Sequence, residues 1–152
     1  MRKVLFGGAF DLLHAGHIRA FYKAREFGDY LVVSVLSDER IKAKNGKRDV
    51  FKENLAPIIP AKERVEIVRA LRPVDEVVCL EGDPDYPVIK LLDLVKPDVL
   101  VLCLDEYNAM HVDLSRERSA CEERGIELVT IPRIITESGL DSSGIIDKIL
   151  TA

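Results

Sequence analysis

The stretch Gly7-Gly8-Ala9-Phe10-Asp11-Leu12-Leu13-His14-Ala15-Gly16-His17 joins an apolar run, Val4–Phe6, to a segment of helical periodicity at about residues 16–27. Glycines directly after a buried strand let the main chain approach a ligand without side-chain collision. The first turn of a helix offers N–H groups and the positive end of the helix dipole, and both favour phosphate. The stretch therefore predicts a strand, a tight turn and a helix that together bind an anion.

The same alternation of apolar runs and helical spacing continues along the chain. Further strands are predicted at residues 30–36, 74–80, 98–104 and 126–131, and helices at 60–71, 84–95, 114–124 and 142–150. Strands that are apolar along their whole length are typical of a parallel sheet covered on both faces. We therefore expect one α/β domain over residues 1–152, doubly wound and Rossmann-like, with five parallel strands in the order 3-2-1-4-5. Its ligands would bind at the carboxyl ends of the strands.

The segment between Arg40 and Lys52 interrupts this alternation. It is rich in basic residues and has no sustained period, so we expect a mobile loop there. Because it follows the second strand, its lysines would lie at the same edge of the sheet as the glycine stretch.

The composition excludes several classes of protein. Hydrophobic residues make up 47% and charged residues 32% of the chain, as in ordinary globular domains. The net charge of −4 argues against broad nucleic-acid binding, which needs a basic face. The 3 cysteines share no C-x-x-C spacing and are expected to be small buried side chains rather than a zinc site or catalytic thiol. No signal peptide or membrane span is evident, so we expect a cytoplasmic protein with no membrane partner.

His14 and His17 are the strongest candidates for chemistry. Spaced by three residues, they can project from one helical turn into the predicted anion site. An imidazolium there would donate to phosphate oxygens and offset charge that builds up on a leaving group. The alternative is a capped helix with two incidental surface histidines. His111 has no comparable setting and is expected to be structural or incidental.

Gly8, Phe10, Asp11, His14, Gly16 and His17 spell G-x-F-D-x-x-H-x-G-H, and on these residues the chain resembles the cytidylyltransferase-like nucleotidyltransferase family. Within it, residues 28–33, 74–77 and 132–143 are similar to the glycerol-3-phosphate cytidylyltransferase group. The resemblance implies transfer of a nucleoside monophosphate, CMP favoured, from CTP or ATP to a phosphorylated alcohol such as glycerol 3-phosphate, with release of pyrophosphate. The alternatives are an adenylyltransferase that uses ATP with a sugar phosphate or FMN, and a non-catalytic nucleotide sensor.

The resemblance also implies roles for single residues. Catalysis would fall to His14, His17, Arg133 and a lysine, with Lys44 ahead of Lys47. The nucleotide would contact Gly8, Ala9, Phe10, Asp11, Gly16, Asp105, Ser142 and Ser143, and Arg64 would hold the acceptor phosphate or the loop. Mg²⁺ would be bound mainly through the nucleotide phosphates, and a homodimer is expected.

For the charged residues the alternative is a solvated surface position, and for Ser142 a helix cap without ligand. The chain also departs from the family pattern at three places. Ala9 stands where many relatives carry threonine or serine, Asp141 replaces the first serine of the C-terminal motif, and Asp105 lacks its usual preceding glycine.

Overall fold

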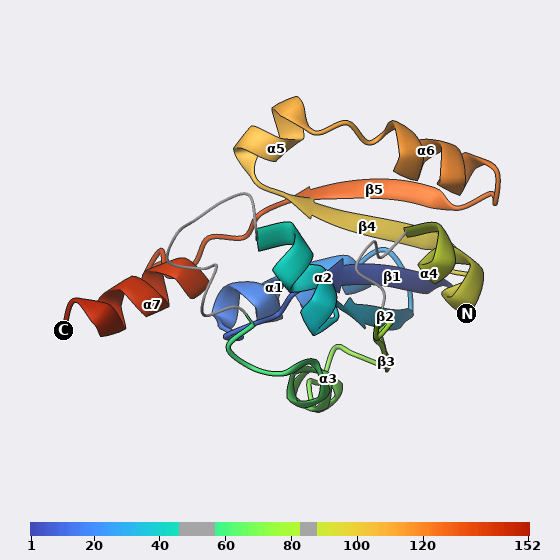
Figure 1. The fold of residues 1–152 in the computed structure, drawn as a ribbon. Coiled ribbons are helices and arrows are strands. Elements are labelled where there is room, and N and C mark those ends of the chain that lie inside the picture. The colour runs from blue at the N-terminus through green and yellow to red at the C-terminus, as the bar shows by residue number, and fades with distance from the viewer. Residues whose placement is uncertain (46–56, 83–87) are drawn as a thin grey trace.

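The protein, a computed structural model, is described over residues 1–45, 57–82 and 88–152 (Figure 1). Its elements follow one another as β1 (Lys3–Gly8), α1 (Ala15–Arg25), β2 (Tyr30–Val35), α2 (Asp38–Asn45), α3 (Ala61–Arg69), β3 (Glu76–Val78), α4 (Val88–Val95), β4 (Val99–Leu104), α5 (Glu106–His111), α6 (Ser115–Glu122), β5 (Glu127–Pro132) and α7 (Ser142–Leu150).

The strands form one sheet with the order β3-β2-β1-β4-β5, and every pairing is parallel. β1 lies at the centre, paired with β2 on one side and with β4 on the other. The predicted fold class and strand order are therefore confirmed. The order reverses at β1, so the carboxyl end of this strand is the topological switch where such sheets bind ligands.

Helices cover both faces of the sheet, as a doubly wound fold requires. Successive β1 residues alternate between the faces: Val4 and Phe6 pack in a cluster with α1 and α3, whereas Leu5 packs in a cluster with α4 and α6. Burial on both sides explains why the strands read as continuous apolar runs.

The predicted loop at residues 40–52 is wrong over its first part, because α2 spans Asp38–Asn45. The Ser37 hydroxyl accepts a hydrogen bond from the Arg40 N–H at 3.1 Å, and Asp38 and Glu39 stand in the first turn. Of the described side chains of this helix, at residues 38–43, Ile41 is the buried one. The Ser37 cap and the two acidic residues in the first turn stabilise the start of the helix. A single apolar residue produces no helical periodicity that could be recognised in the sequence. Residues 46–52 lie outside the described residues.

Two further elements, α5 and β3, differ from the predictions. α5 was not expected; it follows Asp105, whose carboxylate accepts from the Asn108 N–H at 2.7 Å and caps the helix. β3 is shorter than predicted, at three residues. α4 begins at Val88 in the described chain, and residues 83–87 lie outside it.

α7 stands apart from the layers that cover the sheet. Figure 1 shows it beyond the carboxyl ends of β4 and β5, at the end of the molecule opposite the N-terminus. None of its residues is buried, and Ile149 and Leu150 are exposed. In the part of the chain that the structure describes, no helix is long and apolar enough to span a bilayer. Cytoplasmic location and a homodimer stay predictions.

Candidate active site

A cavity of about 670 Å³ opens at the carboxyl ends of the strands, where α1 and α7 begin. The predicted site residues that line it are Gly8, Ala9, Phe10, Asp11, His14, Gly16, His17, Arg133, Ser142 and Ser143. Arg64 and Asp105 do not line it. The side chain of Lys44 and all of Lys47 lie outside the described residues.

The two histidines begin α1 with a reciprocal pair of hydrogen bonds. His14 is the N-cap residue, and its Nδ1 accepts from the Gly16 N–H at 3.2 Å. His17 Nδ1 accepts in turn from the His14 N–H, also at 3.2 Å. Since Nδ1 accepts in both rings, the proton of each neutral imidazole is on Nε2. Nε2–H is therefore the donor that each ring retains for a ligand.

Burial, with smaller contributions from the neighbouring His14 and Arg133, lowers the pKa of His17 to about 4. Burial also lowers the pKa of His14, where Asp141 opposes the shift and Arg133 adds to it. Both rings are thus neutral at pH 7 in the protein without ligand. The imidazolium expected beside a bound phosphate stays a prediction, and a neutral Nε2–H also donates to a phosphate oxygen.

Aromatic packing fixes the histidine rings in place. The centroids of His14 and His17 lie 3.9 Å apart, and Phe10 meets His17 edge-on at 5.5 Å. Phe10 is buried and packs on Phe21 at 4.9 Å, although its own φ of 52° is unfavourable for a residue with a side chain. A Cβ at Gly8 would lie 2.8 Å from the Phe10 ring. Gly8 and Phe10 therefore shape the turn that presents His17.

Gly16 is required by the position of the His14 ring. A Cβ at this residue would lie 2.9 Å from Cε1 of His14 and 3.1 Å from the Ile134 carbonyl oxygen. The glycine lets the ring fold back over the first turn of its own helix.

Arg133 follows β5, and its guanidinium forms an ion pair with Asp141. The other carboxylate oxygen of Asp141 accepts from the Gly144 N–H at 2.7 Å, so Asp141 is the N-cap of α7. The Gly144 N–H, at the helix start where an oxyanion site is predicted, is therefore bonded to a carboxylate of the chain. Ser142 is the first helical residue instead of the cap.

Two of the predicted nucleotide contacts bind the protein itself. The Ser142 hydroxyl donates to the Asp11 carbonyl at 2.8 Å, which ties the start of α7 to the turn after β1. The Asp11 carboxylate accepts from the N–H groups of Ile58 and Ile59, at 2.8 and 2.9 Å. Both residues line the cavity, yet these polar atoms hold its walls together.

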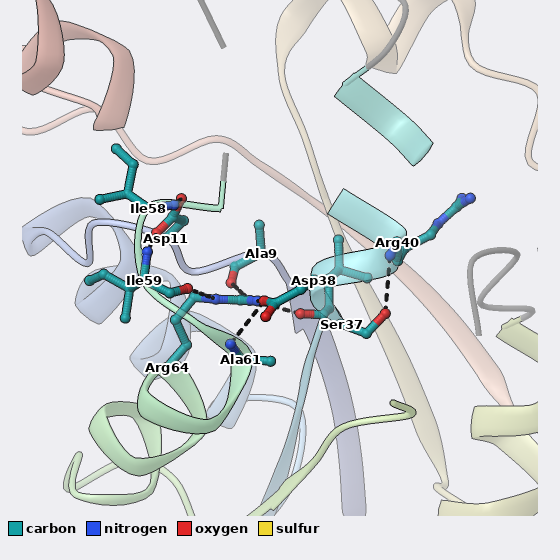
Figure 2. A network of polar contacts seen from close by, with 10 residues as sticks. Ala9, Asp11, Ser37, Asp38, Arg40, Ile58, Ile59, Ala61 and Arg64 are labelled. Atoms are coloured by element: carbon teal, nitrogen blue, oxygen red, sulfur yellow. Dashed lines mark hydrogen bonds and ion pairs between the residues drawn. The ribbon is translucent and has the colours of Figure 1, made fainter. Parts of the chain in front are cut away.

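Arg64 is fully buried, and its guanidinium is surrounded by protein atoms to which it bonds (Figure 2). At 2.7 Å each, Nε donates to the Ile59 carbonyl, one terminal nitrogen donates to the carbonyls of Ala9 and Leu36, and the other to the Asp38 carboxylate. The guanidinium thus joins the ends of β1 and β2 to the segment before α3. This place differs from the predicted contact with the acceptor and agrees with the other expected role, in which Arg64 holds the segments that flank the loop.

Sequence reasoning missed several residues that line the cavity: Leu36, Ile41, Ile58, Cys103 and Asp147. Ile41 and Ile58 flank a basic stretch without periodicity, so no pattern pointed to them. Burial raises the pKa of the Cys103 thiol, which agrees with the expected inert cysteine. Asp105 shares both carboxylate oxygens with Asn108 and caps α5.

Among the residues that the structure describes, no group of three or more His, Cys, Asp or Glu side chains is placed to hold a metal ion. Mg²⁺ bound through a ligand's phosphates stays a prediction.

The model of the family described as "Cytidylyltransferase-like" matches residues 5–148, which include the histidine turn, the sheet and the start of α7. The chain belongs to the cytidylyltransferase-like family. The resemblance inferred from the glycine and histidine motif is thereby confirmed.

Among curated proteins, this cytidylyltransferase-like chain is similar to FAD synthase of Pyrococcus abyssi, with 35% identity over 97% of this chain and 91% of that protein. FAD synthase of Ferroglobus placidus is 34% identical, over 99% and 90% of the two chains. These relatives, with the family match, indicate that the chain is a nucleotidyltransferase.

Among solved structures, the chain resembles the lipopolysaccharide core biosynthesis protein from Thermoplasma volcanium. The TM-score is 0.66 and the identity 28%, over 88% of this chain and 97% of that one. The cytidylyltransferase-like fold is therefore shared over nearly the whole domain.

Proposed function

We propose that this enzyme transfers AMP from ATP to the phosphate of FMN, which yields FAD and pyrophosphate. The observation that carries the proposal is the similarity to FAD synthases over almost the entire chain. It favours the adenylyltransferase alternative of the sequence analysis over transfer of CMP to glycerol 3-phosphate.

In the proposed reaction a phosphate oxygen of FMN attacks the α-phosphorus of ATP. The new bond joins that oxygen to the α-phosphorus, and the bond from the α-phosphorus to the bridging oxygen of the β-phosphate breaks, so pyrophosphate leaves with that electron pair. The nucleophile is already an anion, so the protein needs no general base; it positions the reactants and stabilises charge.

His14 and His17 are proposed to donate from Nε2 to the triphosphate. Their Nδ1 atoms are held by backbone N–H groups, so the orientation of each ring is set before ATP arrives. Donors that need no reorganisation stabilise developing charge most effectively. The histidine that is deeper in the protein, His17, is expected to carry more of this effect.

Arg133 is proposed to bind the departing pyrophosphate. It lines the cavity, its side chain is about half exposed, and it lies close enough to both histidines to lower their pKa. A guanidinium can hold two phosphate oxygens at once. Its present partner, Asp141, would have to share it with the nucleotide.

Two elements of the proposal come from the family resemblance. Mg²⁺ would be held mainly by the phosphates of ATP and would neutralise part of their charge. A lysine from the basic segment, Lys44 first, would approach the same phosphates.

The test is the rate of product formation from ATP or CTP with FMN or glycerol 3-phosphate, in all four combinations with Mg²⁺. We expect FAD and pyrophosphate from ATP with FMN, at a rate at least tenfold above the other pairs. Faster turnover of CTP with glycerol 3-phosphate would replace this proposal by the first expectation. Nucleotide binding without pyrophosphate release in any pair would indicate a sensor.

The variant His17→Ala tests the proposed role of this histidine. We expect its turnover to fall by on the order of 10²–10³, because one preorganised donor to the transition state is lost. A circular dichroism spectrum would check that α1 still forms. Turnover within threefold of wild type would remove His17 from the chemistry.

A further inference from the structure

Three apolar side chains line the cavity on the β2 side of β1: Leu36, which follows the strand, Ile41 of α2, and Ile58. We call these three residues the apolar wall. Ile41 is buried, whereas Ile58 is 42% exposed and lines the cavity that also holds the histidines and Arg133. An exposed isoleucine in such a place offers contact area to a ligand.

The wall is fixed by charged groups behind it. Ile58 donates its N–H to Asp11, and the carbonyl of Leu36 accepts from the buried Arg64, which also bonds the carbonyl of Ile59 (Figure 2). Hydrogen bonds to charged groups are stronger than neutral ones. Ile58 and Leu36 are therefore held in place without a ligand, and little ordering is needed when one binds.

The apolar wall and the cationic part of the cavity stand on opposite sides of β1. Leu36 and Ile41 follow β2 and Ile58 precedes α3, whereas Arg133 follows β5, and β1 and β4 separate β2 from β5 in the sheet. In phosphoryl transfer the attacking and leaving oxygens lie roughly in line with the phosphorus between them. Pyrophosphate that leaves toward Arg133 therefore requires an acceptor that arrives from the side of the wall.

We propose that Leu36, Ile41 and Ile58 bind the apolar ring system of the acceptor, the isoalloxazine of FMN, and so select an aromatic acceptor over a polyol phosphate. The inference rests on the proposed function and deepens it. A fused aromatic ring gains by covering these side chains. The hydroxyl groups of a small polyol phosphate would face the same surface without hydrogen-bond partners there.

The test compares Ile58→Ala with Ile67→Ala. Ile67 is a matched control, since it is 40% exposed on α3 and does not line the cavity. The dissociation constant of FMN is read from flavin fluorescence in the presence of a non-hydrolysable ATP analogue and Mg²⁺, and the KM values for FMN and ATP from FAD formation.

We expect Ile58→Ala to raise the dissociation constant and the KM for FMN by on the order of tenfold, since several buried methyl and methylene contacts are lost. The KM for ATP should stay within twofold, and Ile67→Ala should match wild type. Ile58→Leu, which restores the volume, should return FMN binding to within threefold of wild type.

Equal FMN binding by Ile58→Ala and Ile67→Ala would overturn the inference, and so would an equal rise of both KM values in Ile58→Ala. If the wild-type enzyme makes FAD while either of these results is found, the proposed function holds and only the inference about the apolar wall is rejected. A wild-type enzyme that binds no FMN overturns both. Where FMN binds without FAD formation, the fluorescence comparison still decides the role of the wall.

Discussion

Arg64 and Arg133 carry the same charged group, were both expected to meet phosphate, and have opposite surroundings. Arg64 is fully buried, and its partners are three backbone carbonyls and the Asp38 carboxylate. Arg133 is 46% exposed at the cavity, and its ion-pair partner is Asp141. The comparison indicates that Arg64 has a structural role, because its donors are bonded to buried carbonyls and a carboxylate. Arg133 is the arginine proposed to bind phosphate, since it lies half exposed at the cavity.

The largest expected effect separates the two arginines by stability. Arg64→Met should lower the free energy of unfolding by about 3–5 kcal/mol, because it leaves buried acceptors without partners. Arg133→Met should lower it by less than about 1 kcal/mol, since exposed ion pairs contribute little. Urea unfolding followed by circular dichroism measures both. Equal losses would mean that the two sites do not differ as the structure indicates.

The next effect concerns turnover. Arg133→Met should reduce the rate of pyrophosphate release by on the order of 10², because a charge that faces the leaving group is removed. Arg133→Lys should recover only part of it, since an ammonium group cannot hold two oxygens side by side. Single-turnover kinetics with saturating ATP measures the step. A fully active Arg133→Met would assign Arg133 to the same structural class as Arg64.

The expected pH dependence of the free energy of unfolding follows from the imidazole of His17. The pKa of His17 is about 4 when folded and near 6.5 when unfolded, so below pH 6.5 the unfolded chain takes up a proton that the folded chain does not. This single group should lower the free energy of unfolding by about 2 kcal/mol between pH 7 and pH 5. The loss should be complete near pH 4.

His17→Asn is the control for this effect, as its side-chain oxygen can still accept from the His14 N–H. Urea unfolding at pH 7 and pH 5 should give a smaller pH dependence for the variant than for wild type. The same pH dependence in both would place the titration in other groups.

The smallest expected effect is on nucleotide affinity. Asp141→Asn keeps a good N-cap for α7 but removes the charge that competes for Arg133. ATP should bind roughly threefold to tenfold more tightly, because one anion no longer has to be displaced. Calorimetric titration of ATP with Mg²⁺ measures the change. Weaker binding would show that Asp141 assists the nucleotide.

The sheet and the histidine turn could be predicted because local patterns dictate them. Strands buried on both faces must be apolar throughout, and α7 was predicted with its observed bounds, Ser142–Leu150. The motif from Gly8 to His17 is contiguous, so its residues lie together whatever the rest of the chain does. The arrangement that follows β1 was therefore expected from sequence.

Other parts depend on contacts between distant segments, which one sequence does not reveal. Arg64 reaches Ala9 across 55 positions of the chain, and Asp11 reaches Ile58 across 47. Among the α2 side chains that the structure describes, residues 38–43, Ile41 is the buried one and most others are charged, so the sequence shows no apolar face. At Arg64 and Asp11, side chains expected at a ligand make bonds to distant parts of the chain. At α2, a helix stands where a loop was expected.

The reciprocal hydrogen bonds of His14 and His17 have a further consequence. The same two bonds begin a helix and fix the tautomers of both rings at the cavity, so in the proposed mechanism local folding and the positioning of both donors are a single event. Fraying of the first turn would release both rings together. Hydrogen exchange at the Gly16 amide would thus report how often the two proposed phosphate donors are displaced.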